Sequence, residues 1–301
     1  MNNFIEYFYG IKIDKIVYSD KYYSFVYNGY VYRLYIYNDT FNSLKSLYDI
    51  NQKMIKNTLM SEIIINKDNQ IISYFNDVSY ILIKIFSNIN KSISLEEISF
   101  LSKSLYQEKL NINWGVLWSN KVDYLEELIN ENGKKYPLIV DSFNYFVGMC
   151  ENAISYFNSV SLDGNYKYSV SHKVIKFDDR VDVLYNPMNI IFDYRVRDVA
   201  EYIKNSFFSN NYNIFNELVL YLNNNNLTLA EVKILISRLL YPSFYFEMYE
   251  DILIDNKEEK IILDIVSRIE GYEDYLNKVI TFFRISYNID EIGWLKQISL
   301  K

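Results

Sequence analysis

The sequence contains one histidine, His172, and one cysteine, Cys150, and both side chains are candidates for catalytic chemistry. An imidazole can donate or accept a proton near neutral pH, so a lone histidine invites a catalytic interpretation. However, His172 shares an alternating strand pattern with Val170 and Val174, and no Ser-His-Asp or Cys-His arrangement can be proposed around it. We therefore expect a structural role for His172. Cys150 lies on the apolar face of an expected helix, which indicates a buried, inert thiol.

A second group of candidates is the charged cluster Asp193, Arg195, Arg197 and Asp198, which follows the apolar run NIIF. Two interpretations stay open. In the first, the cluster is a solvated set of ion pairs, with Asp198 in the first turn of a helix, where the helix dipole favours a carboxylate. In the second, Asp193 is an oxygen ligand for Mg²⁺ in a corner that also holds phosphate. A zinc site is excluded, because one cysteine and one histidine cannot supply its ligands.

The composition excludes several classes of protein. The 301 residues carry a formal net charge of −7 and show no basic stripe, so we expect no nucleic-acid partner. The first ten residues have neither the basic region nor the cleavage site of a signal peptide. Apolar runs such as YILIKIF are too short to span a bilayer. We expect a soluble, intracellular protein without a membrane partner.

The elements that position these candidates begin with a strand-rich region, residues 1–90. Short apolar segments dominate it, and Asn28–Gly29 between two of them is a strong hairpin signal, because both residues tolerate positive φ. Residues 40–56 follow helical periodicity. The predicted order is β-β-β-α-β-β, a five-stranded antiparallel sheet with one helix. The turn around Ser19–Asp20 has no glycine to bring backbone amides onto a phosphate.

Residues 91–301 are predicted to be mostly helical. Ser94 with Glu97 forms a capping-box pattern, and Asn113 precedes a helix that ends at Gly133. A period of two in YKYSVSHKVIKF, followed by NIIFDY, predicts a β hairpin embedded between helices. Strands that come first and helices that come second imply an α+β protein with two lobes, 1–90 and 91–301. The other expected helices cover residues 142–158, the RVRDVAEYIKNSFF segment, 213–224, 228–240, 244–253 and 257–287.

This plan resembles the two-lobed protein-kinase-like fold, in its aminoglycoside-phosphotransferase branch. Four stretches resemble kinase-like spore coat proteins of the CotS and YutH type: NWGVLWSNKVDYLEEL, SFNYFVGMCENAISYF, YSVSHKVI and YNPMNIIFDYRVRDVAEYI. The resemblance extends over most of the chain and is most specific around residues 140–203. It implies a site assembled from the third strand and the embedded hairpin.

An active member of that fold needs a strand-three lysine for the phosphates, a proton-accepting Asp after the loop histidine, and an Asn and an Asp for magnesium. Here the lysine position holds Arg33, a bulkier cation, and only Asp49 on the next helix could pair with it. The proton-accepting position holds Val174, which cannot take a proton. The asparagine position falls near Asp179, and Asp193 matches the last magnesium ligand.

The resemblance therefore implies a degenerate, pseudokinase-like protein with a structural or binding role in the spore coat. It would be made in the mother-cell cytoplasm, be deposited in the coat, and contact other coat or assembly proteins. If ATP and Mg²⁺ bind as relic cofactors, Arg33 and Asp193 would hold them, and His172 would orient the loop.

Two alternatives stay open. The first is a divergent ATP-dependent phosphotransferase that acts on a small hydroxylated substrate, with Asp178, Asp179 or Asp182 as the base after a local shift of register. The second is an interaction module that binds nucleotide without turning it over.

Overall fold

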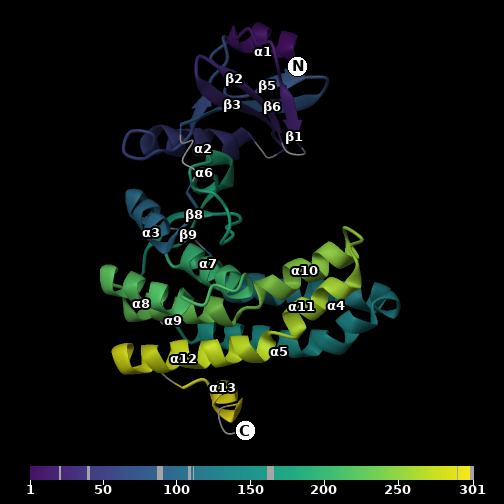
Figure 1. Ribbon diagram of the computed structural model, residues 1–301, viewed down its shortest axis with the longest axis vertical. Helices are drawn as coiled ribbons and strands as arrows, with labels where there is room; N and C mark the ends of the chain where they lie inside the picture. The colour runs from purple at the N-terminus through teal and green to yellow at the C-terminus, as the bar shows by residue number, and fades with distance from the viewer. Residues whose placement is uncertain are drawn as a thin grey trace.

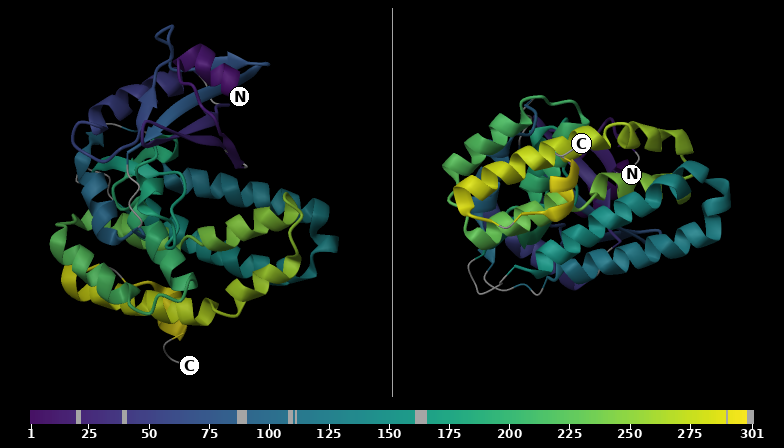
Figure 2. Two further views of the ribbon diagram at one scale, coloured as in Figure 1. Left: turned by 45° about the horizontal axis from the view of Figure 1, so that its top comes forward. Right: turned by 90° about the horizontal axis from the view of Figure 1, so that it is seen from below.

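The computed structural model describes residues 1–19, 22–38, 41–86, 91–107, 110, 112–160, 166–289 and 291–298. An antiparallel sheet forms the first part of the chain, and a helical body that encloses a small second sheet forms the rest (Figure 1). This confirms the predicted α+β class. Figure 2 shows the first sheet stacked on one end of the helical body. The division near residue 90 stays a prediction, because residues 87–90 and the expected turn at Asp20 lie outside the described residues.

The described residues of the N-terminal lobe form six strands, one more than predicted. Their order in the sheet is β1-β2-β3-β6-β4, and the short β5 pairs with β6. The Asn28–Gly29 turn joins β2 to β3 with φ of 49° and 78°, as the hairpin signal predicted. The strands are β1 (Val17–Ser19), β2 (Tyr22–Tyr27), β3 (Tyr30–Ile36), β4 (Glu62–Ile64), β5 (Ser73–Phe75) and β6 (Val78–Ile85).

Two helices cover opposite faces of this sheet. The predicted helix is α2 (Phe41–Met54), and its Leu44 is buried against one face. The other face is covered by α1 (Asn2–Tyr9), through Phe4 and Ile5. Helix α1 was not predicted, because eight residues rich in aromatic side chains form a stable helix only when they pack against a neighbour.

The C-terminal lobe places its helices around one continuous apolar core. Local capping signals define several helix starts: the side chains of Ser94 and Asn113 accept backbone hydrogen bonds, and Thr228 with Glu231 forms a complete capping box. No described helix is both long and apolar enough to cross a membrane. The helices up to residue 253 are α3 (Leu95–Ser104), α4 (Trp114–Asn132), η1 (Gly133–Lys135), α5 (Pro137–Asn158), α6 (Val181–Leu184), η2 (Pro187–Asn189), α7 (Arg197–Phe208), α8 (Ile214–Asn224), α9 (Leu229–Leu240) and α10 (Ser243–Leu253).

The single long helix predicted for residues 257–287 is wrong. The segment forms η3 (Glu259–Ile261), α11 (Ile262–Val266) and α12 (Ile269–Tyr287), and α13 (Gly293–Ile298) follows. Arg268 separates α11 from α12 with φ of −108° and ψ of 0°. Its guanidinium donates to the carbonyl of Phe208, at the end of α7. This contact between distant segments stabilises a break that the helical periodicity does not reveal.

The embedded hairpin is present as β8 (Tyr168–His172) and β9 (Ile190–Tyr194), and a short strand β7 (Tyr106–Gln107) adds a third strand. In the hairpin register, His172 lies opposite Ile190 and Ser169 lies opposite Asp193. This small sheet lies between the N-terminal lobe and the main helical layers (Figure 1). It therefore positions both His172 and Asp193 near the junction of the lobes.

Candidate functional site

His172 is buried at the end of β8 and is held by three contacts with the protein itself. Its Nδ1 lies 2.6 Å from Asp198 Oδ2, its Nε2 lies 2.9 Å from the carbonyl oxygen of Leu184, and its backbone N–H donates to Asp198 Oδ1 at 3.1 Å. Asp198 lies in the first turn of α7, and Leu184 lies in α6. Both ring nitrogens are thus engaged, and the imidazole ties α6 and α7 to the hairpin.

Asp193, in β9, is buried among hydrogen-bond donors and cations. Its Oδ1 accepts from the indole Nε1 of Trp114 at 2.8 Å and from the backbone N–H of Tyr194 at 2.7 Å. Its Oδ2 accepts from Arg197 Nη1 at 2.9 Å, and Arg238 Nη1 lies 4.0 Å away. Asp193 is only 1% exposed. Its negative charge is neutralised inside the protein by the guanidinium groups of Arg197 and Arg238.

These surroundings do not fit a magnesium ion. Mg²⁺ needs several oxygen ligands in an octahedral arrangement, whereas both oxygens of Asp193 already accept hydrogen bonds. An added cation would also stand beside Arg197 and Arg238. No group of three or more His, Cys, Asp or Glu side chains in the described part of the chain could hold a metal ion. Magnesium binding at Asp193 therefore stays a prediction that this geometry does not favour.

Arg33, in β3, pairs with a carboxylate of the other lobe. Its Nη2 donates to Asp182 Oδ2 in α6 at 3.1 Å, and its guanidinium carbon lies 4.8 Å from the centre of the Tyr22 ring. Asp49, the partner expected from the sequence, is exposed on α2. The pKa of Arg33 is raised: burial acts to lower it, but the neighbouring Tyr35 and Asp182 outweigh burial. The expected phosphate-binding cation thus already has an anionic partner.

Asp182 belongs to the segment between β8 and β9, residues 173–189, which we call the β8–β9 loop. It also contacts the N-terminal lobe through its backbone and amide side chains. The backbone N–H of Ser61 donates to the carbonyl of Tyr185 at 2.9 Å, and Asn186 Nδ2 donates to the hydroxyl of Tyr35 at 3.2 Å. Met188 packs against the apolar cluster under the sheet. Figure 1 shows α6, within this loop, directly beneath α2.

Asn189 and Asp179 both bind the backbone of this loop. Asn189 closes the loop: its Nδ2 donates to the Val174 carbonyl at 2.8 Å, and its Oδ1 accepts from the Val174 N–H at 3.1 Å. A count forward from His172 led to Asp179, which instead accepts from the backbone N–H of Lys176 at 2.9 Å.

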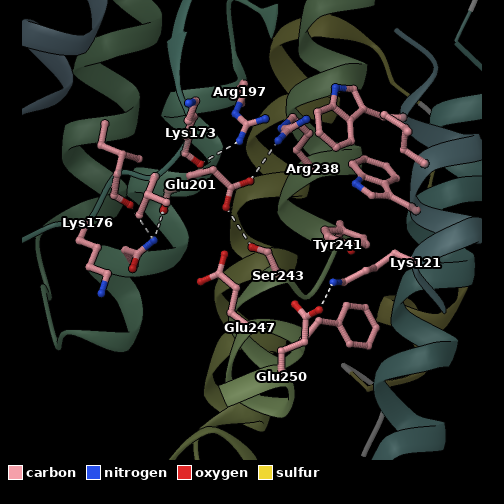
Figure 3. Close-up of a pocket in the computed structure, with 17 residues that line it drawn as sticks. Lys121, Lys173, Lys176, Arg197, Glu201, Arg238, Tyr241, Ser243, Glu247 and Glu250 are labelled. Carbon is pink, nitrogen blue, oxygen red and sulfur yellow. Dashed lines mark hydrogen bonds and ion pairs between the residues drawn. The ribbon is translucent and has the colours of Figure 1, made fainter. Parts of the chain in front are cut away.

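A cavity of about 330 Å³ opens beside Val174, entirely within the C-terminal lobe (Figure 3). Aromatic rings form one wall, where Trp118 stacks on Tyr241 with ring centres 4.6 Å apart. Phe246 continues this wall, and Trp114 links it to Asp193. The half-exposed Val174 presents only methyl groups to the space where the resemblance would place a proton acceptor.

Carboxylates of α7 and α10 also line this cavity. Glu201 accepts from Ser243 Oγ at 2.9 Å, and Glu250 pairs with Lys121. Burial acts to raise the pKa of Glu201, but Lys204 and neighbouring arginines lower it to about 2. Glu247 reaches solvent, and its pKa is raised, first by partial desolvation among its neighbours and then by Glu201. The cavity therefore offers aromatic surface, fixed ion pairs and one carboxylate whose pKa is raised.

None of the three aspartates proposed as alternative bases lines this cavity. Asp178 is exposed, and Asp179 is held by the backbone of its own loop. Asp182 reaches the junction of the lobes, but there it is bound to Arg33. The structure thus pairs Arg33 with Asp182 at the junction of the lobes, and it pairs Asp193 separately with Arg197 and Arg238.

Comparison with known sequences decides the family. The family model described as "Spore coat putative kinase YutH" matches residues 2–279. The chain belongs to this family. Endospore coat-associated protein YutH of Bacillus subtilis (strain 168) is 25% identical over 208 residues, which are 60% of this chain and 61% of that protein. The chain thus spans about three-fifths of the length of the curated YutH relative, and the resemblance found in the sequence is confirmed.

Solved structures show the fold of this YutH family member. An aminoglycoside phosphotransferase from Alicyclobacillus acidocaldarius superposes with a TM-score of 0.69 at 10% identity, over 91% of this chain and 93% of that one. A spectinomycin phosphotransferase in complex with ADP and spectinomycin gives 0.56 at 10% identity, over 92% of each chain. At such identities the likeness shows the fold alone, and it confirms the predicted kinase-like architecture.

Proposed function

We propose that this protein is a catalytically inactive, kinase-like component of the spore coat that acts by binding or by a structural role. The observation that carries the proposal is Val174, because phosphoryl transfer to a hydroxyl group uses a positioned carboxylate at this place in the loop. An aliphatic side chain cannot accept the proton. The cations around Asp193 support the same conclusion, since they occupy the oxygens that a metal would need.

Family membership supports the association with the spore coat, and the Bacillus subtilis relative is described as endospore coat-associated. We infer synthesis in the mother-cell cytoplasm and later deposition in the coat. Its partners there would be other coat or assembly proteins. Localisation of a fluorescently tagged chain during sporulation tests this inference: a signal that stays diffuse in the mother cell, with none on the spore, would refute it.

Titration with Mg²⁺-ATP tests the absence of catalysis. A ligand that binds only the folded state stabilises it by about 2.7 kcal/mol at 100 times its Kd, so binding must raise the melting temperature. Because Asp182 already neutralises Arg33, we expect no rise with millimolar Mg²⁺-ATP and no phosphorylated product. A melting shift without turnover would instead indicate a nucleotide-binding module. ATP-dependent phosphorylation that Asp193→Ala abolishes would instead establish the divergent phosphotransferase.

A further inference from the structure

A second cavity in the C-terminal lobe lies away from the kinase-like site. Its volume is about 350 Å³, and it shares no lining residue with the cavity beside Val174. It is formed where the connection between α7 and α8 meets α12. The proposed coat function makes no use of this cavity.

Four of the described residues that line this second cavity are aromatic. Phe207 and Tyr275 line it with ring centres 5.6 Å apart, and Phe215 lines it from α8. Tyr212 lies at the mouth with its side chain 95% exposed. Aromatic rings interact favourably with a flat ligand in stacked or edge-to-face arrangements. The cavity is therefore suited to a planar ring.

The charge of the second cavity is opposite to that of the whole protein. Arg268 and Lys278 line it, and none of its described lining residues is Asp or Glu. Arg268 is paired with Asp264, whereas Lys278 contacts the Phe215 ring at 4.1 Å and has no described carboxylate partner. The chain as a whole carries a net charge of −7. Lys278 is thus the lining cation without a described counter-charge, and an unpaired cation beside aromatic rings indicates a site that prefers an anion.

Tyr275 adds a hydrogen-bond donor that the protein does not use. Its side chain is 9% exposed, and its hydroxyl has no partner among the described residues. Burial, and to a lesser degree Glu217, raise the pKa of Tyr275, so the hydroxyl keeps its proton near neutral pH. A buried donor left without an acceptor destabilises the fold, and such groups call for an explanation. An acceptor on a bound ligand would provide one.

We propose that this cavity binds a small planar aromatic carboxylate. Its ring lies among Phe207, Phe215 and Tyr212, and its carboxylate accepts a hydrogen bond from Tyr275 and pairs with Lys278. The aromatic walls set the shape of the ligand, and the cations set the sign of its charge. The proposed binding site does not take part in phosphate transfer, so the proposal holds whether or not the protein transfers phosphate.

Calorimetric titration with 2-naphthoate and with the neutral 2-naphthalenemethanol tests the ligand class. We expect 2-naphthoate to bind at least about tenfold more tightly, because only its carboxylate can form a charge-assisted hydrogen bond in the cavity. Lys278→Gln should remove most of this preference. Equal affinities, or no binding of 2-naphthoate at millimolar concentration, would overturn the proposal.

Two matched variants on α12 separate ligand binding from folding. Tyr275→Phe should weaken 2-naphthoate binding about tenfold and leave the melting temperature unchanged or raised, because no internal hydrogen bond is lost. Tyr272→Phe is the control: its hydroxyl donates to the Leu239 carbonyl at 2.7 Å, so this variant should melt earlier and bind as before. If Tyr275→Phe lowers the melting temperature and keeps full affinity, the hydroxyl is structural and the assignment fails.

Discussion

At the scale of single residues, Asp193 anchors a buried charged network that joins β9 to three helices. Trp114 from α4, Arg197 from α7 and Arg238 from α9 all converge on it. Both guanidinium groups also lie over the Trp114 ring, at 5.4 Å and 4.5 Å from its centre. Asp193, which resembles a metal ligand in the sequence, thus serves here as a counterion for Arg197 and Arg238.

Replacement of Asp193 should therefore cost stability in the absence of any metal. Asp193→Asn removes the carboxylate that pairs with Arg197, and breaking a buried pair in this way costs about 3–5 kcal/mol. Arg238 keeps its ion pair with Glu201. Urea unfolding in EDTA measures the effect. The exposed Asp178→Asn is the control and should stay within about 0.5 kcal/mol of the wild type. A loss for Asp193→Asn that appears only when Mg²⁺ is present would show that Asp193 is a metal ligand instead.

Glu201 predicts a dependence of stability on pH. Its pKa in the folded protein is about 2, below the ordinary value of 4.5, so its ionised form stabilises the fold above pH 4.5. This contribution, on the order of 3 kcal/mol, should decline as the pH falls from 4.5 to 2. Glu201→Gln should accordingly unfold more easily at pH 7 and match the wild type near pH 2. Parallel stability curves for the two proteins over this range would contradict the assignment.

At the scale of elements, the β8–β9 loop connects the two lobes. It brings Asp182 to Arg33 and Asn186 to Tyr35, and its other end is closed by Asn189. The linker before α3 joins it as well, since the N–H of Ile93 donates to the Asp179 carbonyl at 3.0 Å. The loop is therefore an ordered bridge, and its contacts fix how the N-terminal lobe sits on the helices.

Weakening this bridge should loosen the loop more than the core. Asp182→Asn removes the charge opposite Arg33 and should cost about 1 kcal/mol. Amide hydrogen exchange in the β8–β9 loop and in residues 91–93 should then become about fivefold faster. The buried helices α5 and α9 should exchange as in the wild type. Uniform acceleration over the whole chain, or none, would show that the bridge does not act as a separate unit.

At the scale of the whole molecule, local signals predicted most of the fold. The Asn28–Gly29 turn, the caps at Ser94, Asn113 and Thr228, and the embedded hairpin depend on neighbours in sequence, and all are present. The α+β division followed from them. Helix α1, strand β7 and the break at Arg268 are among the features that escaped prediction, because they depend on distant contacts.

The candidate site was less predictable for the same reason. The sequence singled out Arg33, His172, Val174 and Asp193, and the structure places the last three around the embedded hairpin. Their partners could not be inferred, since Arg33 binds a carboxylate of the other lobe rather than Asp49. The charged cluster around residues 193–198 proved to be made of ion pairs, but Asp193, Arg195 and Asp198 are buried rather than solvated.

The pairing of Arg33 with Asp182 has a consequence for biosynthesis. The two residues are 149 positions apart, so the first lobe leaves the ribosome long before its counter-charge is made. Contacts between distant parts of a chain also form slowly, because a long loop must close first. A nascent first lobe would meanwhile present an unneutralised guanidinium and the apolar surface destined for Met188. Half-made chains are therefore where a chaperone would matter most for this protein.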